Sequence, residues 1–296
     1  MKWVKLLMGK IVKEIEFDKM QGLGNDYVYL TCIKSLPDGL PELAKAISDR
    51  HFGVGGDGMV VITRSECADF RMIMFNADGS EAQMCGNASR CIGLLVYEKG
   101  LTDKSEITLE TLAGIKHLKL NFEDGEIKNV SVNMGKPFLK ASEIPVILSE
   151  TDSPVVVQTV QIDGNPIDIH CVGVGNPHGV IFMNVDEEFF QKNGRRLERH
   201  EIWPEKANIE FVKITGAQSI DMRVWERGTG ETLACGTGAC ASAVAAILTG
   251  RVQSPVTVRM KGGSLEVSLN DKGEVIMTGD AEHVAHGFYF YTPAEK

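Results

Sequence analysis

The sequence predicts an α+β protein with two pseudo-symmetric domains, each a mixed, mostly antiparallel sheet curled around a central helix. One observation is an internal duplication: residues 70–87 and 220–237 follow the same pattern, with Cys85 and Cys235 at equivalent places 150 residues apart (235 − 85). The other is that each half has several short strand-like runs for every helix-like run, which indicates hairpins and not alternating strand–helix units. Duplicated units of this size usually pack around a two-fold axis and share a site.

Matching motifs extend the duplication over nearly the whole chain. Gly22-Leu-Gly-Asn25 is matched by Gly173-Val-Gly-Asn176, and Arg50-His51 is matched by Arg199-His200. The offsets differ slightly, as insertions in loops would make them differ. Two homologous halves are therefore the firmest conclusion from the sequence.

Hydrophobic periodicity predicts the elements of each half. In the first half, strands are expected at residues 14–20, 27–33, 58–64, 69–75, 106–111, 116–121 and 126–133, and helices at 41–51 and 87–100. In the second half, strands are expected at residues 155–162, 165–172, 179–184, 208–214, 220–226, 255–260, 264–269 and 274–279, and helices at 186–200 and 238–249.

The duplication also predicts the domain limits, residues 1–136 and 137–296, with a linker from Pro137 to Pro154. The tail 286–296 has no obvious counterpart in the first half, and its return to the first domain is left open. Residues 1–14 precede the first repeated motif, and we expect an extra strand or a simple upstream extension there.

Composition indicates a soluble globular protein: 43% of the 296 residues are hydrophobic and 24% are charged. The net charge of −9 and the lack of a basic stripe argue against nucleic acid as a partner. No apolar run is long enough for a membrane span, and lysines interrupt the N-terminal apolar stretch, so no signal peptide is expected either. Seven cysteines without framework spacing favour free thiols in a reducing cytoplasm.

Cys85 and Cys235 are each followed by a glycine and a helix-like run, so each is expected at the N-terminus of a helix. Free backbone N–H groups and the helix dipole there should lower the thiol pKa and bind a carboxylate. Two thiols on opposite sides of one α-carbon suit a reaction that removes a proton from one face and returns one to the other. Free cysteines are more often structural, but the matched positions favour a functional role for this pair.

The other cysteines are expected to be structural. Their spacing does not suit zinc, so no metal is predicted; they are Cys32, Cys67, Cys91, Cys171 and Cys240. Two glycine-rich segments have the glycine spacing of dinucleotide-binding loops. Residues 53–58 have the wrong order of elements around them, and residues 236–241 lack the acidic residue at the end of the next strand. A dinucleotide-binding protein stays as a minor alternative.

Six motifs stand in order along the chain from about residue 15 to the C-terminus. They are Lys19-Met-Gln-Gly-Leu-Gly-Asn-Asp26, Phe75-Asn-Ala-Asp-Gly-Ser-Glu81, Cys85-Gly-Asn87, Gly175-Asn-Pro-His178, Glu226-Arg-Gly-Thr-Gly-Glu231 and Ala234-Cys-Gly-Thr-Gly-Ala239. Together they resemble diaminopimelate epimerase, a family of pyridoxal-phosphate-independent amino-acid racemases. The resemblance implies an isomerase without cofactor that interconverts LL- and meso-diaminopimelate in lysine biosynthesis. It also implies a cytoplasmic homodimer with a small-molecule substrate.

The resemblance assigns a role to each matching position. Cys85 and Cys235 would be the two acid/base residues, and His178 and Glu226 would adjust the thiol pKa values. The substrate-binding positions would be Asn25, Asn76, Gly86, Asn87, Asn176, Asn208, Glu226, Arg227, Gly236 and Thr237. The guanidinium of Arg227 can hold a carboxylate with two parallel hydrogen bonds. Taken alone, Arg227 would more often be a surface ion pair, His178 a structural histidine and the asparagines turn residues.

One position departs from the family pattern: Gly58 stands where many members have glutamine, so a contact there must come from water, backbone or a neighbour. Two further alternatives stay open. One is a racemase of the same fold that acts on another amino acid. The other is a thiol redox switch joining Cys85 to Cys235, which gives no reason for Glu226, Arg227 and the asparagines.

Overall fold

The computed structural model describes residues 2–7, 10–147 and 156–293, and the chain forms two compact units. The first unit combines Met1–Val132 with Asp280–Lys296, and the second is Asn133–Gly279. The boundary thus falls at 132/133 and the return at 280, compared with 136/137 and 286 in the sequence analysis. The boundary lies inside a continuous strand, where no turn residue marks it. Residues 148–154 of the expected linker lie outside the described residues.

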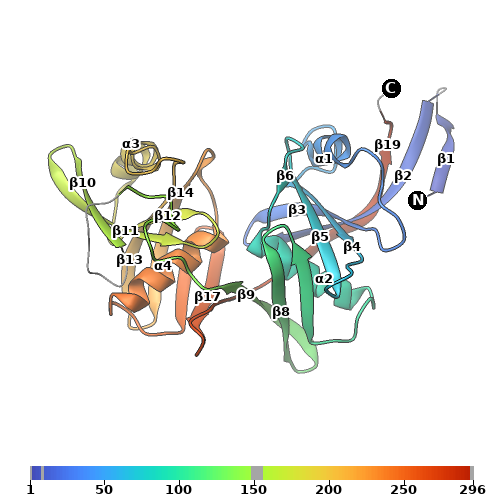
Figure 1. Cartoon of the computed structure of the whole chain (residues 1–296). Helices are drawn as coiled ribbons and strands as arrows, with labels where there is room; N and C mark the ends of the chain where they lie inside the picture. The colour runs from blue at the N-terminus through green and yellow to red at the C-terminus, as the bar shows by residue number, and fades with distance from the viewer. Residues whose placement is uncertain (1, 8–9, 148–155, 294–296) are drawn as a thin grey trace. The chain divides into compact units, whose positions relative to one another are not determined.

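The first unit contains two helices and all seven strands predicted for the first half (Figure 1). Its elements are β1 (Lys2–Leu7), β2 (Lys10–Gly22), β3 (Asn25–Thr31), α1 (Leu40–Ser48), β4 (Gly58–Thr63), β5 (Phe70–Asn76), β6 (Glu81–Ala82), α2 (Gly86–Glu98), β7 (Glu106–Thr111), β8 (Gly114–Glu123), β9 (Glu126–Gly135) and β19 (Glu282–Tyr291). Strand β1 is the extra strand that was one of two expectations for residues 1–14, and β19 contains the C-terminal tail, whose return to the first domain was left open. Strand β6 was not predicted. β6 has only two residues, too few for any periodicity.

The second unit repeats this order. Its elements are β10 (Val156–Ile162), β11 (Asn165–Gly173), β12 (Pro177–Ile181), α3 (Glu187–Glu198), β13 (Asn208–Gly216), β14 (Ser219–Glu226), β15 (Gly230–Glu231), α4 (Gly236–Leu248), β16 (Val256–Met260), β17 (Gly263–Leu269) and β18 (Val275–Gly279). The two-residue strand β15, the counterpart of β6, was also missed. All four predicted helices are present.

The duplication is visible in the strand pairings. β3 pairs with β4 in parallel, as β12 does with β13, and β5 pairs with β7 in parallel, as β14 does with β16. The other described pairs within each unit are antiparallel, and most join neighbouring strands, for example β7–β8–β9 and β16–β17–β18. The predicted class, a mixed and mostly antiparallel α+β fold, is confirmed.

One helix lies at the centre of each unit. The apolar residues of α2 recur at helical spacing, so Ala88, Ile92 and Leu95 are all buried. The alanine-rich α4 is buried over nearly its whole length against strands of its own unit. Both helices end at the same place, before Gly100 and Gly250, whose left-handed backbone (φ of 63° and 68°) suits a helix terminus.

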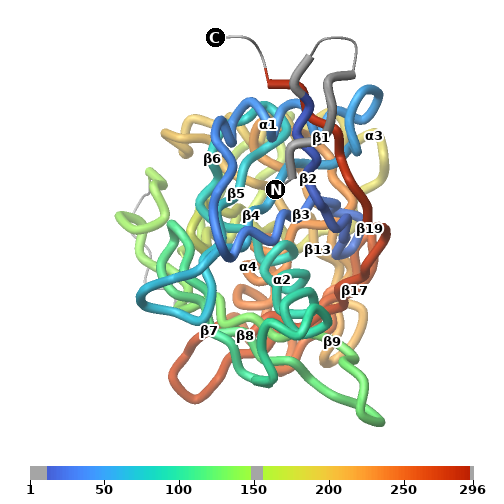
Figure 2. Tube along the Cα trace, turned by 90° about the vertical axis from the view of Figure 1, so that its right-hand side faces the viewer, coloured from blue at the N-terminus to red at the C-terminus, as the bar shows by residue number. Residues whose placement is uncertain are grey.

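The C-terminal strand returns to the first unit. β19 pairs antiparallel with β2, from Glu282 opposite Gln21 to Tyr291 opposite Lys13. Figure 2 shows the red C-terminal strand running beside the blue β2. Tyr289 and Tyr291 face the core that α1 covers, together with Ile15 and Val28. The return therefore completes the hydrophobic core of the first unit.

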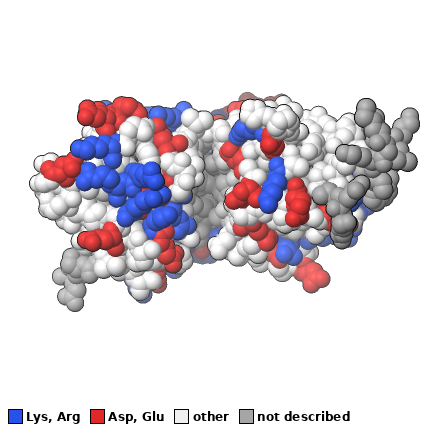
Figure 3. Space-filling view, turned by 90° about the horizontal axis from the view of Figure 1, so that it is seen from above, with Lys and Arg blue, Asp and Glu red and all other residues white. Residues whose placement is uncertain are grey.

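The surface is mixed in charge. Figure 3 shows basic side chains gathered over α3 of the second unit, with acidic ones beside them. Lys192 and Arg196 both pair with Asp163, and Arg223 pairs with Glu187 and Glu231. These cations are therefore largely paired and do not form a bare basic stripe. Within the described ranges, no helix is long and apolar enough to cross a membrane.

Candidate active site

Each of the two predicted catalytic cysteines is the N-cap residue of a central helix. Cys85 precedes α2 with an extended backbone (φ −135°, ψ 127°), and Cys235 precedes α4 in nearly the same conformation (φ −128°, ψ 110°). Gly86 and Gly236 are the first residues of their helices, so their N–H groups are among those left without an intrahelical partner. The helix ends can therefore bind an anion beside each sulfur.

In the first unit, three predicted site residues lie together. The thiol of Cys85 lies 3.4 Å from Oδ1 of Asn25, and Nδ2 of Asn87 donates to the same oxygen at 3.4 Å. Asn25 begins β3 and Asn87 belongs to the first turn of α2. Asn25, which was predicted to bind substrate, is therefore also the hydrogen-bond acceptor beside the Cys85 thiol.

The side chain of Asn25 is oriented by Asp57, which was not among the predicted site residues. Its Nδ2 donates to Oδ2 of Asp57 at 2.7 Å, and Arg50 bridges Asp57 (2.9 Å) and Asp26 (2.7 Å). The carboxylate therefore fixes which end of the Asn25 amide faces Cys85. Asp57 could have been found in the sequence, since it lies in the glycine-rich motif that was weighed as a dinucleotide loop.

In the second unit, Cys235 is buried, with 7% of its surface exposed. Its sulfur accepts the backbone N–H of Gly238 at 3.4 Å and lies 3.5 Å from Oγ1 of Thr237. These contacts are those expected for a sulfur at a helix N-terminus.

The predicted lowering of the thiol pKa is wrong for Cys235. Burial raises its pKa well above the ordinary value, and the negative charges of Glu226 and Glu210 raise it further. The hydrogen bonds from Thr237 and Gly238 act in the opposite direction and are outweighed. Cys235 is therefore a protonated thiol near neutral pH in this structure.

Two other predicted residues of the second unit form a buried hydrogen-bonded chain. His178 is fully buried; its Nδ1 lies 2.7 Å from Oε1 of Glu210 and its Nε2 lies 2.9 Å from Oδ1 of Asn176. Glu210 was not among the predicted site residues. A lone acidic residue in the apolar run Asn208-Ile-Glu-Phe-Val212 was the signal that could have found it.

Two of the predicted substrate-binding residues, Asn208 and Arg227, are joined by a hydrogen bond. Oδ1 of Asn208 accepts the N–H of Arg227 at 2.9 Å, and the Arg227 guanidinium reaches the carbonyl of Glu205 at 3.3 Å. The next residue, Gly228, donates its N–H to the buried Glu198 at 3.0 Å. The turn that contains Arg227 is thus fixed on both sides.

Two predicted positions have different surroundings. Asn76, at the end of β5, is exposed and donates to Ser80 at 3.0 Å. At Gly58 a Cβ atom would lie 2.1 Å from the carbonyl oxygen of Phe75, so this backbone excludes any side chain. Gly58 lies opposite Tyr27 as Asn208 lies opposite His178, so one half lacks the polar side chain that the other half has.

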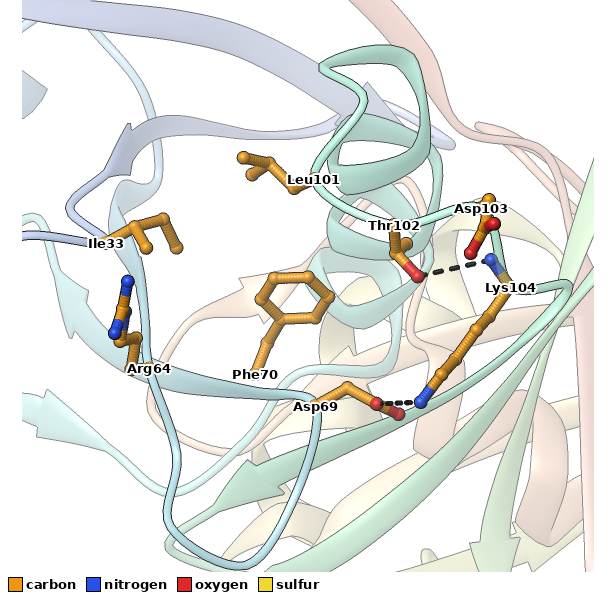
Figure 4. Close-up of a pocket in the computed structure, with 8 residues that line it drawn as sticks. All are labelled: Ile33, Arg64, Asp69, Phe70, Leu101, Thr102, Asp103 and Lys104. Carbon is orange, nitrogen blue, oxygen red and sulfur yellow. Dashed lines mark hydrogen bonds and ion pairs between the residues drawn. The ribbon is translucent and has the colours of Figure 1, made fainter.

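A separate pocket of about 350 Å³ lies in the first unit (Figure 4). The side chain of Asp69 is paired with Lys104 at its edge, and none of the predicted site residues lines it. It is lined by Ile33, Arg64, Asp69, Phe70, Leu101, Thr102, Asp103 and Lys104. This pocket is therefore not the candidate site. Across the described part of the chain, no cluster of three or more histidine, cysteine, aspartate or glutamate side chains has a metal-binding arrangement.

Comparison with known proteins identifies the family. The sequence model described as diaminopimelate epimerase matches residues 17–140 and 170–284. The chain belongs to the diaminopimelate epimerase family. A diaminopimelate epimerase of Acetivibrio thermocellus is 49% identical over 276 residues, which are 92% of this chain and 98% of that protein. One of Methanococcus maripaludis is 50% identical over 275 residues, which are 92% of this chain and 99% of that protein. The resemblance drawn from the six motifs is confirmed.

More distant solved structures share the fold of this diaminopimelate epimerase family member. A phenazine biosynthesis protein of the PhzF family from Bacillus anthracis superposes with a TM-score of 0.64 at 18% identity, covering 93% of this chain and 99% of the other. A hydroxyproline epimerase from Agrobacterium vitis gives 0.64 at 14% identity, covering 96% and 93%. At these identities the likeness concerns the fold alone.

Proposed function

We propose that this protein is an isomerase that interconverts LL- and meso-diaminopimelate, with Cys85 and Cys235 as the acid and base and without a cofactor. The single observation behind the proposal is that a chain of this family has a cysteine as N-cap of both central helices, at matched positions. One thiolate takes the α-proton while the other thiol delivers a proton to the opposite face.

The two thiols share one proton, so their titration belongs to the pair. The raised pKa of Cys235 suits a thiol that enters one direction of the reaction protonated. The reacting carboxylate is proposed to bind at the helix ends, on Gly86, Asn87, Gly236 and Thr237. Their backbone N–H groups would stabilise the negative charge that develops in the transition state.

The remaining predicted residues are proposed to bind the rest of the substrate. Asn25, Asn76, Asn176 and Asn208 supply amide groups, and Arg227 and Glu226 bind the distal carboxylate and ammonium. His178 and Glu226 are proposed to adjust the thiols. A cytoplasmic homodimer in lysine biosynthesis completes the proposal, in keeping with the resemblance.

The decisive experiment is to incubate the purified protein with LL-diaminopimelate and separate the stereoisomers. In deuterated water, early product should contain deuterium at the inverted carbon while recovered substrate stays almost unlabelled, because two different groups exchange the proton. Unlabelled early product would contradict the two-base mechanism. Comparable turnover of proline, glutamate or histidine would favour a racemase of another amino acid.

Single substitutions test the thiols themselves. Cys85→Ala and Cys235→Ala should each lower the rate by about 10²–10⁴-fold, the usual contribution of an acid or a base. The matched control is Cys240→Ala, a buried cysteine of the same helix α4, which should keep the activity. Substantial epimerisation by either single variant would refute the proposal.

A further inference from the structure

Glu210 is a buried carboxylate with one partner. It is fully buried on β13, and its Oε1 lies 2.7 Å from Nδ1 of His178. Its Oε2 has no hydrogen-bond partner among the described residues. Oε1 also lies against the first turn of α4, since a Cβ atom on Gly238 would be 2.6 Å from it. The positive end of that helix favours an ionised carboxylate.

A buried anion requires a positive partner. Of the described residues, His178 is the one side chain that pairs with Glu210. If Nδ1 donates to Glu210 and the ring is the counter-charge, Nε2 is protonated as well. Nε2 must then donate to an acceptor, and the atom 2.9 Å away is Oδ1 of Asn176.

The orientation of the Asn176 amide follows from this hydrogen bond. Because Oδ1 accepts from His178, the NH₂ group of Asn176 is left to donate elsewhere, and it donates to none of the described residues. The opposite amide orientation would need a bare Nε2, which would leave the Glu210 carboxylate buried beside a neutral ring. Asn176 is therefore a hydrogen-bond donor.

The equivalent asparagine of the first unit has the reverse orientation. Asn25 gives its NH₂ group to Asp57 at 2.7 Å, and its Oδ1 accepts from Cys85 and Asn87. Asn25 is therefore an acceptor. Asn25 and Asn176 match in the repeat, but their amide orientations differ because Asn25 contacts the carboxylate of Asp57 and Asn176 contacts the imidazole of His178.

The pair behind Asn176 has no counterpart in the first unit. His178 lies opposite Asn208 on the neighbouring strand, as Tyr27 lies opposite Gly58. Glu210 is two residues beyond Asn208, and the residue two beyond Gly58 is the buried Val60. The second unit thus has an ionic pair where the first has a tyrosine and a valine.

We propose that Glu210 is a positioning residue that, through His178, fixes Asn176 as a hydrogen-bond donor to a substrate carboxylate, while Asp57 fixes Asn25 as an acceptor. The identity of the ligand as a carboxylate rests on the proposed function. The hydrogen-bond roles of the two asparagines rest on their contacts with Asp57 and His178 and not on the proposed function.

Nitrogen NMR of histidine-labelled protein tests the relay directly. The His178 signals are assigned by their loss in His178→Gln. We expect Nε2 of the unchanged protein to carry a proton that it donates to Asn176, and we expect the signal of this nitrogen to change in Glu210→Gln. The control is Ser242→Ala, which removes another buried polar group of the same unit and should leave the His178 signals unchanged.

The spectrum of the unchanged protein is decisive even if a variant fails to fold. A bare Nε2 would overturn the proposal, because Asn176 would then have to donate to the ring. The spectrum needs no turnover, so it tests the relay separately from the proposed function. A protonated Nε2 in a protein without epimerase activity would sink the proposed function and support the relay.

Kinetics test the consequence for the substrate. Glu210→Gln should lower kcat/KM for diaminopimelate by about tenfold to a hundredfold, the usual effect of losing one charge-assisted hydrogen bond, and mainly through KM. Asn176→Asp should be worse than Asn176→Ala, because it replaces a donor by a negative charge. Equal activity of the aspartate and alanine variants would contradict a donor role.

Discussion

Removal of the Glu198 side chain should loosen the turn that contains Arg227. Glu198 ends α3 with 2% of its surface exposed, and it accepts Nε1–H of Trp225 at 3.1 Å and the N–H of Gly228 at 3.0 Å. In Glu198→Ala the partly buried indole N–H of Trp225 loses its acceptor, and so does the N–H of the exposed Gly228, which water can reach. Each buried unsatisfied donor costs about 1–3 kcal/mol, and the small cavity adds to this.

We therefore expect Glu198→Ala to lower the free energy of unfolding by about 2–4 kcal/mol. For a protein of this size each kcal/mol shifts Tm by about 2–4 °C, so Tm should fall by roughly 4–16 °C. Glu198→Gln should lose less, because its amide oxygen still accepts one of the two hydrogen bonds. If Arg227 binds the distal carboxylate, KM for diaminopimelate should rise more than kcat falls.

Calorimetry and steady-state kinetics on the same samples provide the measurement. The matched control is Glu201→Ala, an exposed glutamate three residues further on, which should change the free energy of unfolding by less than about 0.5 kcal/mol. A Glu198→Ala protein within about 1 kcal/mol of the unchanged chain would refute the reasoning, because the Trp225 N–H would then have found another acceptor.

Three further predictions concern Gly58, Cys171 and the pair of Cys85 and Cys235. Gly58→Ala, and equally Gly58→Gln, should destabilise the chain by about 1–3 kcal/mol or more in urea unfolding, since the new Cβ meets the Phe75 carbonyl; unchanged stability would show that this strand pair can move apart. Burial raises the pKa of Cys171 to about 12 from 9.0. Its contribution to stability is therefore complete below about pH 9 and is lost as the pH rises towards 12, costing about 2 kcal/mol at pH 10.5, and Cys171→Ala should remove this part of the pH slope in denaturant titrations. If Cys85 and Cys235 face one substrate, air should inactivate the protein and a dithiol restore it, with mass spectrometry joining these two cysteines; a different joined pair would argue against facing thiols.

Much of the fold could be predicted because the sequence contains the same pattern of motifs and elements in both halves. The repeat around Cys85 and Cys235 gave the two-unit organisation, and the strand and helix periods gave the elements between. Strands β6 and β15 escaped prediction because two residues show no periodicity. The return of the C-terminal tail was left open, because β19 is stabilised by pairing with β2 at the other end of the chain, which no local pattern contains.

The candidate site divides in the same way. Sequence spacing placed Cys85 and Cys235 at helix ends, because a helix start is a local event governed by the next few residues. The pKa of Cys235 was mispredicted, since burial and the charges of Glu210 and Glu226 come from other strands.

By itself, then, the sequence determined the family, the duplicated architecture and the positions of the two thiols. Only the tertiary structure decided which groups stand behind them. Asn25 and Asn176 match in the repeat, yet Asp57 turns one amide into an acceptor and His178 with Glu210 turns the other into a donor. The physical reason is that hydrogen-bond polarity and burial depend on the neighbours that the strand pairing supplies, and these neighbours are remote in the chain.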